Sequence, residues 1–204
     1  MAKELGYMYM DTGAMYRALA WKVRKEAVNP SDEKELERIL REIAIELKER
    51  DGHLRVFLNG CDITEEIRTP ELSQWASKVS TLRVVREKMV ELQRAMGHGG
   101  GVVAEGRDIG TVVFPRADVK IYLDASSQER ARRRFQELKS QGKHVTLEET
   151  REEMEERDRR DKERELAPLC QAGDAVLIDS TAFSVDEVVE KIMHEIRKKK
   201  IAIQ

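Results

Sequence analysis

Apolar and polar positions divide the chain into short strands and longer helices. Four apolar runs, each followed by a small polar or charged residue, predict strands at Tyr7–Met10, Gly101–Ala104, Val119–Leu123 and Ala175–Ile178. The residues that follow them begin with Asp11, Glu105, Asp124 and Asp179. In an open α/β sheet ligands bind beyond the carboxyl ends of the strands, so this pattern indicates a rim of polar groups around one crevice.

Helical periodicity predicts the segments between these strands. We expect helices from Thr12 to about Ala27, Ser31 to about Glu42, Glu71–Ser80, Arg83–Met96, Ser126 to about Lys139, Leu147 to about Leu166 and Ser184–Lys199. Met1–Leu5 is interpreted as the last turn of a helix with Gly6 as its left-handed cap. Ala14, Ala18 and Trp21 are inward candidates of the first long helix. The alternation of strand and helix predicts an α/β fold with a parallel sheet flanked by helices.

Between residues 43 and 94 the pattern changes. Ile43, Ile45 and Leu47 alternate with polar residues, as do Leu54, Val56 and Leu58, and Asn59-Gly60 is a strong hairpin turn. We therefore predict a small antiparallel sheet followed by two helices, which together form an inserted subdomain at 43–94. The core would comprise residues 1–42 and 95–204.

Composition narrows the function classes. Charged residues make up 37% of the chain but nearly cancel to a net charge of −2, which argues against a general attraction to nucleic acid or to an anionic membrane. Cys61 and Cys170 fit neither a disulfide framework nor a metal cluster, so reduced thiols are expected. No apolar run is long enough to cross a bilayer, and we expect a cytoplasmic protein.

A highly charged segment lies near the C-terminal third. Sixteen of the eighteen residues from Glu148 to Glu165 are charged, and pairs such as Glu156 with Arg160 favour a self-paired surface helix. That interpretation leaves a stripe of Arg157, Arg160, Asp161 and Arg164 unexplained, because Arg160 and Arg164 repel each other. A bound polyanion would relieve the repulsion, and arginine grips phosphate oxygens in pairs.

Other charged segments could have either a structural or a functional role. The basic run from Arg130 to Arg134 is either an outer helix face or part of an anion site, whereas Arg107 and Asp108 follow a buried strand in a short loop, which favours function.

His98-Gly99-Gly100-Gly101 resembles an esterase oxyanion loop, but no G-x-S-x-G elbow accompanies it. Gly101 and Gly106 have the spacing of a Walker A loop, but Arg107-Asp108 replaces its Lys and Ser or Thr.

Five stretches together closely resemble the bacterial cytidylate kinases. They are Asp11-Thr12-Gly13-Ala14-Met15-Tyr16-Arg17, Glu105–Pro115, Asp124-Ala125-Ser126-Ser127, Arg157–Asp161 and Asp179-Ser180-Thr181. The resemblance implies a P-loop nucleoside monophosphate kinase that moves the γ-phosphoryl of ATP to CMP or dCMP with Mg²⁺. It also implies that the inserted subdomain binds the monophosphate and that residues from about 140 to 166 form a helical lid. ATP, CMP and dCMP would be its partners, with no nucleic acid or membrane, and we expect a monomer.

The resemblance assigns roles to individual residues. Ser77, Arg86 and Asp108 would contact the cytosine, and Asp108 would choose the base because a carboxylate accepts from the exocyclic amine of cytosine but repels the carbonyl of uracil. Thr12 would position the acceptor. The arginines at the phosphates would be Arg17, Arg107 and Arg164. The sugar or the adjacent phosphate would be reached by Arg157 and Asp161. Arg160 would be an additional lid cation. Among these, the catalytic set is Arg107, Arg157, Arg160 and Arg164.

The sequence departs from the family at its start. Members begin with a strand and a G-x-x-x-x-G-K-[ST] loop, whereas this sequence begins in the helix that follows, so it offers no residues for the ATP phosphates or for a metal ion. We expect such a segment upstream. The alternatives are a nucleotide-binding remnant without catalysis and a charged helical interaction protein that does not bind CMP.

Overall fold

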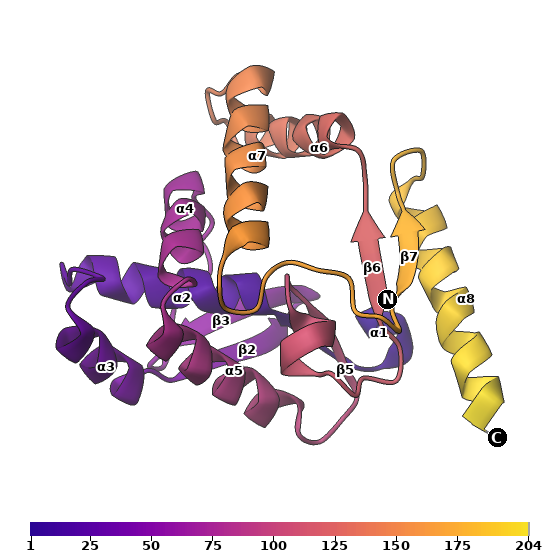
Figure 1. The fold of residues 1–204 in the computed structure, drawn as a ribbon, viewed down its shortest axis with the longest axis horizontal. Coiled ribbons are helices and arrows are strands. Elements are labelled where there is room, and N and C mark those ends of the chain that lie inside the picture. Colours follow the sequence, from indigo (N-terminus) through magenta and orange to yellow (C-terminus); the bar gives the residue numbers. More distant parts are fainter. Residues whose placement is uncertain (204) are drawn as a thin grey trace. The chain divides into compact units, whose positions relative to one another are not determined.

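A computed structural model of the chain describes residues 1–203, which form two compact units (Figure 1). The N-terminal unit comprises Ala2–Ile109 with Arg164–Leu166. The C-terminal unit comprises Gly110–Glu163 and the chain from Ala167 onward, together with Met1. Most of the large, fully buried side chains belong to the N-terminal unit, among them Met10, Met15 and Leu19.

A parallel pair of strands organises the N-terminal unit. Strand β1 (Met8–Asp11) pairs with β5 (Val102–Glu105) in a register that sets Asp11 opposite Glu105. The short helix α1 (Ala2–Leu5) precedes β1, and Gly6 has the positive φ of 66° that a left-handed helix cap requires. The parallel register brings the carboxyl ends of both strands to one edge of the pair.

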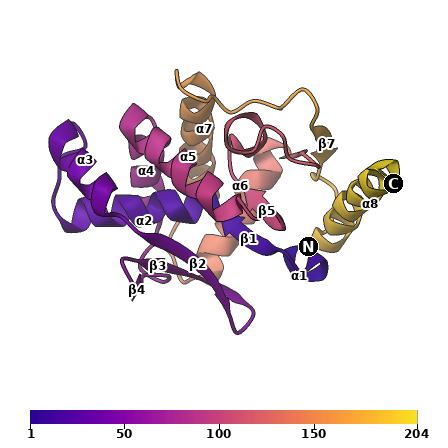
Figure 2. The same ribbon diagram turned by 90° about the horizontal axis from the view of Figure 1, so that it is seen from below.

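Four longer helices belong to the same unit. They are α2 (Thr12–Lys25), α3 (Glu33–Glu42), α4 (Pro70–Val79) and α5 (Arg83–Gly97). Asp11, Asp32 and Thr69 each cap a helix by accepting a hydrogen bond from a backbone N–H of its first turn. Helix α2 packs against α4 and against strand β3, between which it lies (Figure 2).

The predicted antiparallel sheet forms in the same unit. Its strands are β2 (Ile45–Arg50), β3 (His53–Leu58) and β4 (Cys61–Asp62). Asn59 and Gly60 have φ of 49° and 82°, so the Asn-Gly pair makes the expected tight turn. Asp51 and Gly52 also have positive φ angles, 54° and 76°, at the other hairpin.

The C-terminal unit holds a second parallel pair. Strand β6 (Ile121–Asp124) pairs with β7 (Val176–Asp179), and Asp124 lies opposite Asp179. Its helices are α6 (Ser127–Ser140), α7 (Leu147–Glu163) and α8 (Val185–Ile203). Helices α6 and α7 pack against each other and cross (Figure 1). A π-helix, η1 (Ile109–Val113), lies where the chain passes from one unit to the other.

The fold class predicted from the sequence is confirmed: the chain is α/β, with parallel strands flanked by helices and a small antiparallel sheet. Several details differ. Within residues 1–203 the four parallel strands form two hydrogen-bonded pairs and not one continuous sheet. Helix α7 ends at Glu163, short of the expected Leu166. Ala14 and Ala18 are buried as expected, but Trp21 is only half-buried and packs under the Lys25 ammonium, 4.3 Å from the ring centroid.

Candidate functional site

Asp108 lies buried between two arginines in the N-terminal unit. Arg86, on α5, donates a hydrogen bond from Nη2 to Oδ2 of Asp108 and another from Nη1 to the carbonyl oxygen of Ser80 at 3.3 Å. Nη2 of Arg164 lies 4.0 Å from Oδ1 of Asp108. Because the three side chains are between 5% and 8% exposed, water screens their charges poorly, and the carboxylate is held strongly in one orientation.

Two further groups belong to this buried cluster. Tyr16, on α2, lies close enough to Arg86, Asp108 and Arg164 to sense their charges. Burial raises the pKa of its phenol to about 12, Arg86 and Arg164 lower it, and Asp108 raises it. Ser77, on α4, is 6% exposed, and among the described residues its Oγ has no hydrogen-bond partner. A buried hydroxyl in that condition is available to a ligand.

A second cluster forms at the carboxyl ends of β1 and β5. Oδ1 of Asp11 accepts from the backbone N–H of Ala14 at 2.8 Å, which caps α2, and Oδ2 accepts from Nη2 of Arg17 at 3.0 Å. Thr12 donates from its hydroxyl to the backbone oxygen of Glu105 at 2.7 Å. The start of α2 is thereby tied to the end of β5.

The Glu105 carboxyl group is the centre of this second cluster. Burial of the group raises its pKa, the hydrogen bond from Tyr9 lowers it, the charge of Asp11 raises it, and those of Arg17 and Arg107 lower it. Burial, with the same hydrogen bond, raises the pKa of Tyr9 well above its ordinary value, so this phenol stays a donor. Two carboxylates and two guanidinium groups therefore meet beside the end of the parallel pair.

Gly106 separates the two clusters and leaves no room for a side chain. A Cβ atom there would lie 2.3 Å from Oγ1 of Thr12 and 2.8 Å from Cδ1 of Ile109. Any other residue would push the loop away from the start of α2. The close approach holds Arg107 and Asp108, the next two residues, in a fixed loop.

In the C-terminal unit, α7 carries the remaining predicted residues. Asp161 is 4% exposed, and its Oδ2 lies 3.9 Å from Nε of Arg157 one turn earlier. Nε of Arg160 lies 3.5 Å from a carboxylate oxygen of Glu156, the pairing that the sequence predicted. The backbone oxygen of Asp161 accepts from the N–H of Leu169 at 2.7 Å, which folds the following loop back onto the helix.

Charged contacts also join α7 to α6. Arg130 donates from Nη1 to Asp158 and from Nε to the backbone oxygen of Ala125 at 3.0 Å. Arg132 and Arg133 both donate to Glu129 and lower the pKa of its carboxyl group to about 2. Ser126 caps α6 by accepting a hydrogen bond from the N–H of Glu129 at 3.3 Å, while the Glu129 carboxylate accepts from Arg132 and Arg133.

The positions of the ten predicted residues follow from these contacts. Asp108 and Arg86 share a hydrogen bond, and Arg164, Ser77 and Tyr16 belong to the same unit. Arg17 and Arg107, whose charges act on Glu105, belong to it as well. The N-terminal unit thus holds Thr12, Arg17, Ser77, Arg86, Arg107, Asp108 and Arg164, whereas Arg157, Arg160 and Asp161 belong to the C-terminal unit.

The sequence interpretation gave no role to Tyr9, Tyr16 or Ser80. It placed Glu105 only in the general rim of polar residues after the strands, and the register sets it opposite Asp11. The contribution of Ser80 comes from its backbone oxygen and its position after α4, which no residue pattern indicates.

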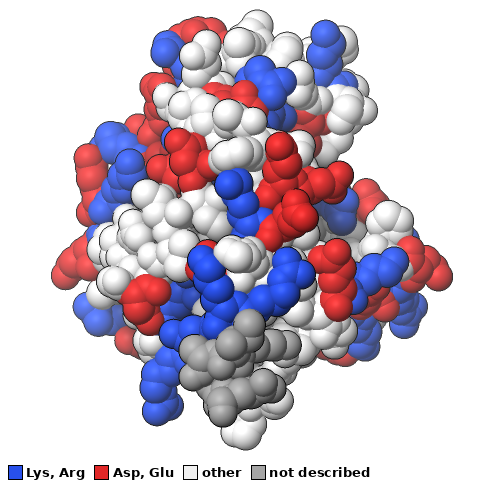
Figure 3. All heavy atoms as spheres, turned by 90° about the vertical axis from the view of Figure 1, so that its right-hand side faces the viewer, with Lys and Arg blue, Asp and Glu red and all other residues white. Residues whose placement is uncertain are grey.

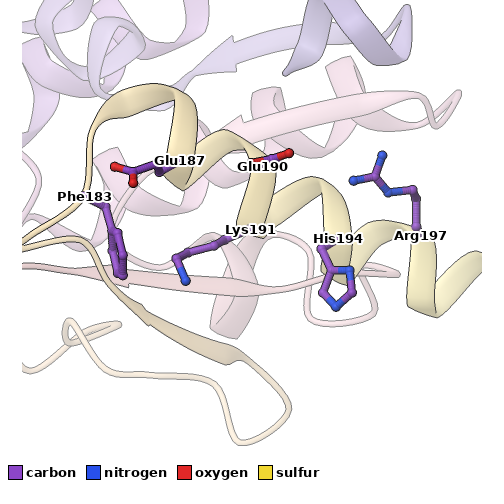
Figure 4. A pocket seen from close by; sticks show the side chains of 6 residues that line it. All are labelled: Phe183, Glu187, Glu190, Lys191, His194 and Arg197. Atoms are coloured by element: carbon purple, nitrogen blue, oxygen red, sulfur yellow. The ribbon is translucent and has the colours of Figure 1, made fainter.

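A shallow pocket on α8 is lined by Phe183, Glu187, Glu190, Lys191, His194 and Arg197, none of them predicted site residues (Figure 4). The Lys191 ammonium lies 4.2 Å from the centroid of the Phe183 ring. On the face that carries α8, basic and acidic side chains lie next to one another (Figure 3). None of the helices described is both long and apolar enough to traverse a bilayer.

Comparison with known proteins identifies the family. A model of the family described as "Cytidylate kinase" matches residues 1–198. The chain is 48% identical over 193 residues to a cytidylate kinase of Caldicellulosiruptor bescii, a match that covers 95% of the chain and 85% of the relative. It is 50% identical over 194 residues to one of Pelotomaculum thermopropionicum, covering 95% and 86%. With one of Geobacter sulfurreducens it shares 45% identity over 202 residues, covering 99% and 87%. Matches of this identity and extent show that the chain belongs to the cytidylate kinase family of nucleoside monophosphate kinases.

Proposed function

We propose that the protein transfers the γ-phosphoryl group of ATP to CMP or dCMP. The observation that carries this proposal is the buried carboxylate of Asp108, oriented by Arg86 and facing Arg164. A fixed acceptor of this kind suits the exocyclic amine of cytosine and disfavours the carbonyl that uracil has in its place. Ser77, whose buried Oγ lacks a partner among the described residues, supplies a further polar contact to the base.

The phosphate of the acceptor nucleotide is assigned to the second cluster. Arg17 and Arg107 both act on Glu105, and Arg17 is held by Asp11 through a 3.0 Å hydrogen bond. Carboxylates fix the guanidinium groups before the substrate arrives, which lowers the entropy lost on binding. Thr12 is assigned to positioning the acceptor from the start of α2.

The remaining roles fall to arginines of the charged segment and its end. We assign Arg157 and Asp161 to the sugar or the adjacent phosphate, Arg160 to an additional cation of the lid, and Arg164 to phosphate. The lid at about 140–166 and the monophosphate-binding subdomain at 43–94 remain part of this proposal. Contacts between α6 and α7, such as Arg130 with Asp158, would couple the movement of such a lid to α6.

The chemistry of the step is mainly electrostatic. Bringing a triphosphate against a monophosphate is unfavourable in water, and the transferring group spreads its charge over its equatorial oxygens. Arg107, Arg157, Arg160 and Arg164 would stabilise this charge, and closure would exclude water from it. No proton transfer by Asp108 is required in this scheme.

Kinases of this kind generally use Mg²⁺ with ATP. In the described part of the chain, no His, Cys, Asp and Glu side chains gather in a group of three or more that could hold a metal ion. The residues described do not form a metal cage, so Mg²⁺ belongs to the proposal only together with ATP.

A coupled assay tests the proposal directly. Incubation of the full-length protein with ATP, Mg²⁺ and CMP should give CDP, and dCMP should give dCDP, whereas UMP should react at least about fivefold more slowly, since one base contact is worth about 1–3 kcal/mol. Saturable CMP binding without CDP formation would contradict catalysis and favour a nucleotide-binding protein. Absence of CMP binding would overturn the whole proposal. Acting on such substrates, the protein is proposed to be a cytoplasmic monomer.

A further inference from the structure

Ser80 connects two of the residues assigned to the base. It is the first residue after α4, is 7% exposed, and donates its backbone N–H to the oxygen of Ala76 at 3.0 Å. Its hydroxyl donates to the backbone oxygen of Ser77 at 2.9 Å, and its own backbone oxygen accepts from Nη1 of Arg86 at 3.3 Å. One buried residue thus touches the backbone of Ser77 and the guanidinium of Arg86.

The hydroxyl replaces a backbone bond that the helix end cannot make. In a continuing α-helix the N–H of Thr81 would donate to the oxygen of Ser77, but here it donates to the oxygen of Lys78 at 3.3 Å. The Ser80 hydroxyl takes over the Ser77 oxygen. A buried carbonyl group at a helix end needs such a donor, so loss of the hydroxyl would let the last turn of α4 rearrange.

The turn therefore determines how the pocket is arranged. Arg86 donates from one nitrogen to Ser80 and from the other to Asp108, so its orientation depends on the Ser80 carbonyl. The buried Oγ of Ser77, which has no partner in the described part of the chain, moves with the same turn. A shift at Ser80 would reach both groups together.

We propose that Ser80 is a positioning residue that sets the preference for cytosine over uracil. The inference rests on the proposed function, because it takes Ser77, Arg86 and Asp108 as the groups that contact the base. Ser80 itself does not need to touch the nucleotide. The hydroxyl and the carbonyl of Ser80 hold the Ser77 hydroxyl and the Arg86 guanidinium in the positions that bind cytosine.

Thr81 offers a matched control. Its Oγ1 donates to the backbone oxygen of Lys78 at 2.8 Å, the same bond one residue later, but the residue is exposed and the bond lies outside the Ser77 and Arg86 network. The experiment compares the wild-type protein with Ser80→Ala, Ser80→Thr and Thr81→Ala. CMP and UMP affinities are measured by isothermal titration calorimetry, which needs no catalysis, and the unfolding temperature of each variant is recorded.

We expect Ser80→Ala to weaken CMP binding by about three- to tenfold, the usual effect of one buried hydrogen bond, while UMP binding changes little. Ser80→Thr, which keeps the hydroxyl, and Thr81→Ala should bind both nucleotides as the wild-type protein does. Equal CMP and UMP losses in Ser80→Ala, or the same loss in a folded Ser80→Thr, would overturn the positioning role. A wild-type protein that bound UMP as well as CMP would overturn the proposed function as well.

Discussion

Arg86 donates a hydrogen bond to Asp108 from within the core, and both side chains are less than a tenth exposed. A buried ion pair of this kind contributes little net stability over an apolar pair, but removal of one partner leaves the other charge uncompensated. The pair is thus costly to disturb. This cost is compatible with a role in recognition, because a rigid acceptor discriminates better than a mobile one.

Asp108→Asn should weaken the preference for CMP over UMP by about ten- to a hundredfold in kcat/KM, since an amide can donate to the uracil carbonyl as well as accept from cytosine. Steady-state kinetics with both nucleotides measure the change. Asp51→Asn, at an exposed hairpin turn, is the control and should leave the ratio unchanged. An Asp108→Asn protein with wild-type preference would show that another group selects the base.

Arg164→Ala should reduce turnover by roughly 10³-fold, on the order of the effect of an arginine finger. Arg159→Ala is the matched control, because Arg159 lies on α7 and donates to Glu156 and Glu163 on the exposed surface. That variant should retain nearly all activity. Near-normal turnover of Arg164→Ala, measured as CDP formed from CMP, would refute the role assigned to Arg164.

Gly106→Ala should destabilise the protein by about 1–3 kcal/mol, because the added methyl group would lie 2.3 Å from Oγ1 of Thr12. Urea unfolding measures the free energy of unfolding. At Gly99 an added Cβ meets no atom within 4 Å, so Gly99→Ala is the control and should be tolerated. If both substitutions cost the same, the close approach at Gly106 does not constrain the loop.

Tyr16 should make stability fall at alkaline pH. Its pKa is raised from 10.0 to about 12, first by burial, with Asp108 raising it and Arg86 and Arg164 lowering it. The unfolded chain therefore loses this proton first, and the contribution of Tyr16, full below pH 10.0, is lost as the pH rises toward about 12. Tyr16→Phe should flatten this part of the curve of unfolding free energy against pH. An unchanged slope in Tyr16→Phe would contradict the shift.

Local patterns predicted the elements better than their ends. The Asn59-Gly60 turn could be found because only a few residue types tolerate two positive φ angles in succession. The end of α7 could not be predicted, because the residues beyond Glu163 still suit a helix. Arg164 nevertheless lies outside the helix, against Asp108, which is more than fifty positions earlier in the sequence. A tertiary contact of that kind leaves no periodic signal.

The candidate site shows the same division. Motif residues such as Arg17 and Asp108 were identifiable from their neighbours in the sequence, but the groups that hold them were not. Ser80 acts through its backbone oxygen and through a hydroxyl that bonds the backbone of Ser77, and Tyr9 acts through a hydrogen bond across the strand pair to Glu105. Supporting contacts depend on register and helix packing, and many residue types could provide them.

The short segment Arg164–Leu166 belongs to the N-terminal unit, although the residues on either side of it belong to the C-terminal one. Neither unit is therefore one uninterrupted stretch of polypeptide. A fragment that stopped at Ile109 would carry Asp108 and Arg86 but not the arginine 4.0 Å from Asp108. Truncation of the protein would therefore disrupt the cluster of Asp108, Arg86 and Arg164, whereas point substitutions leave the chain connectivity intact.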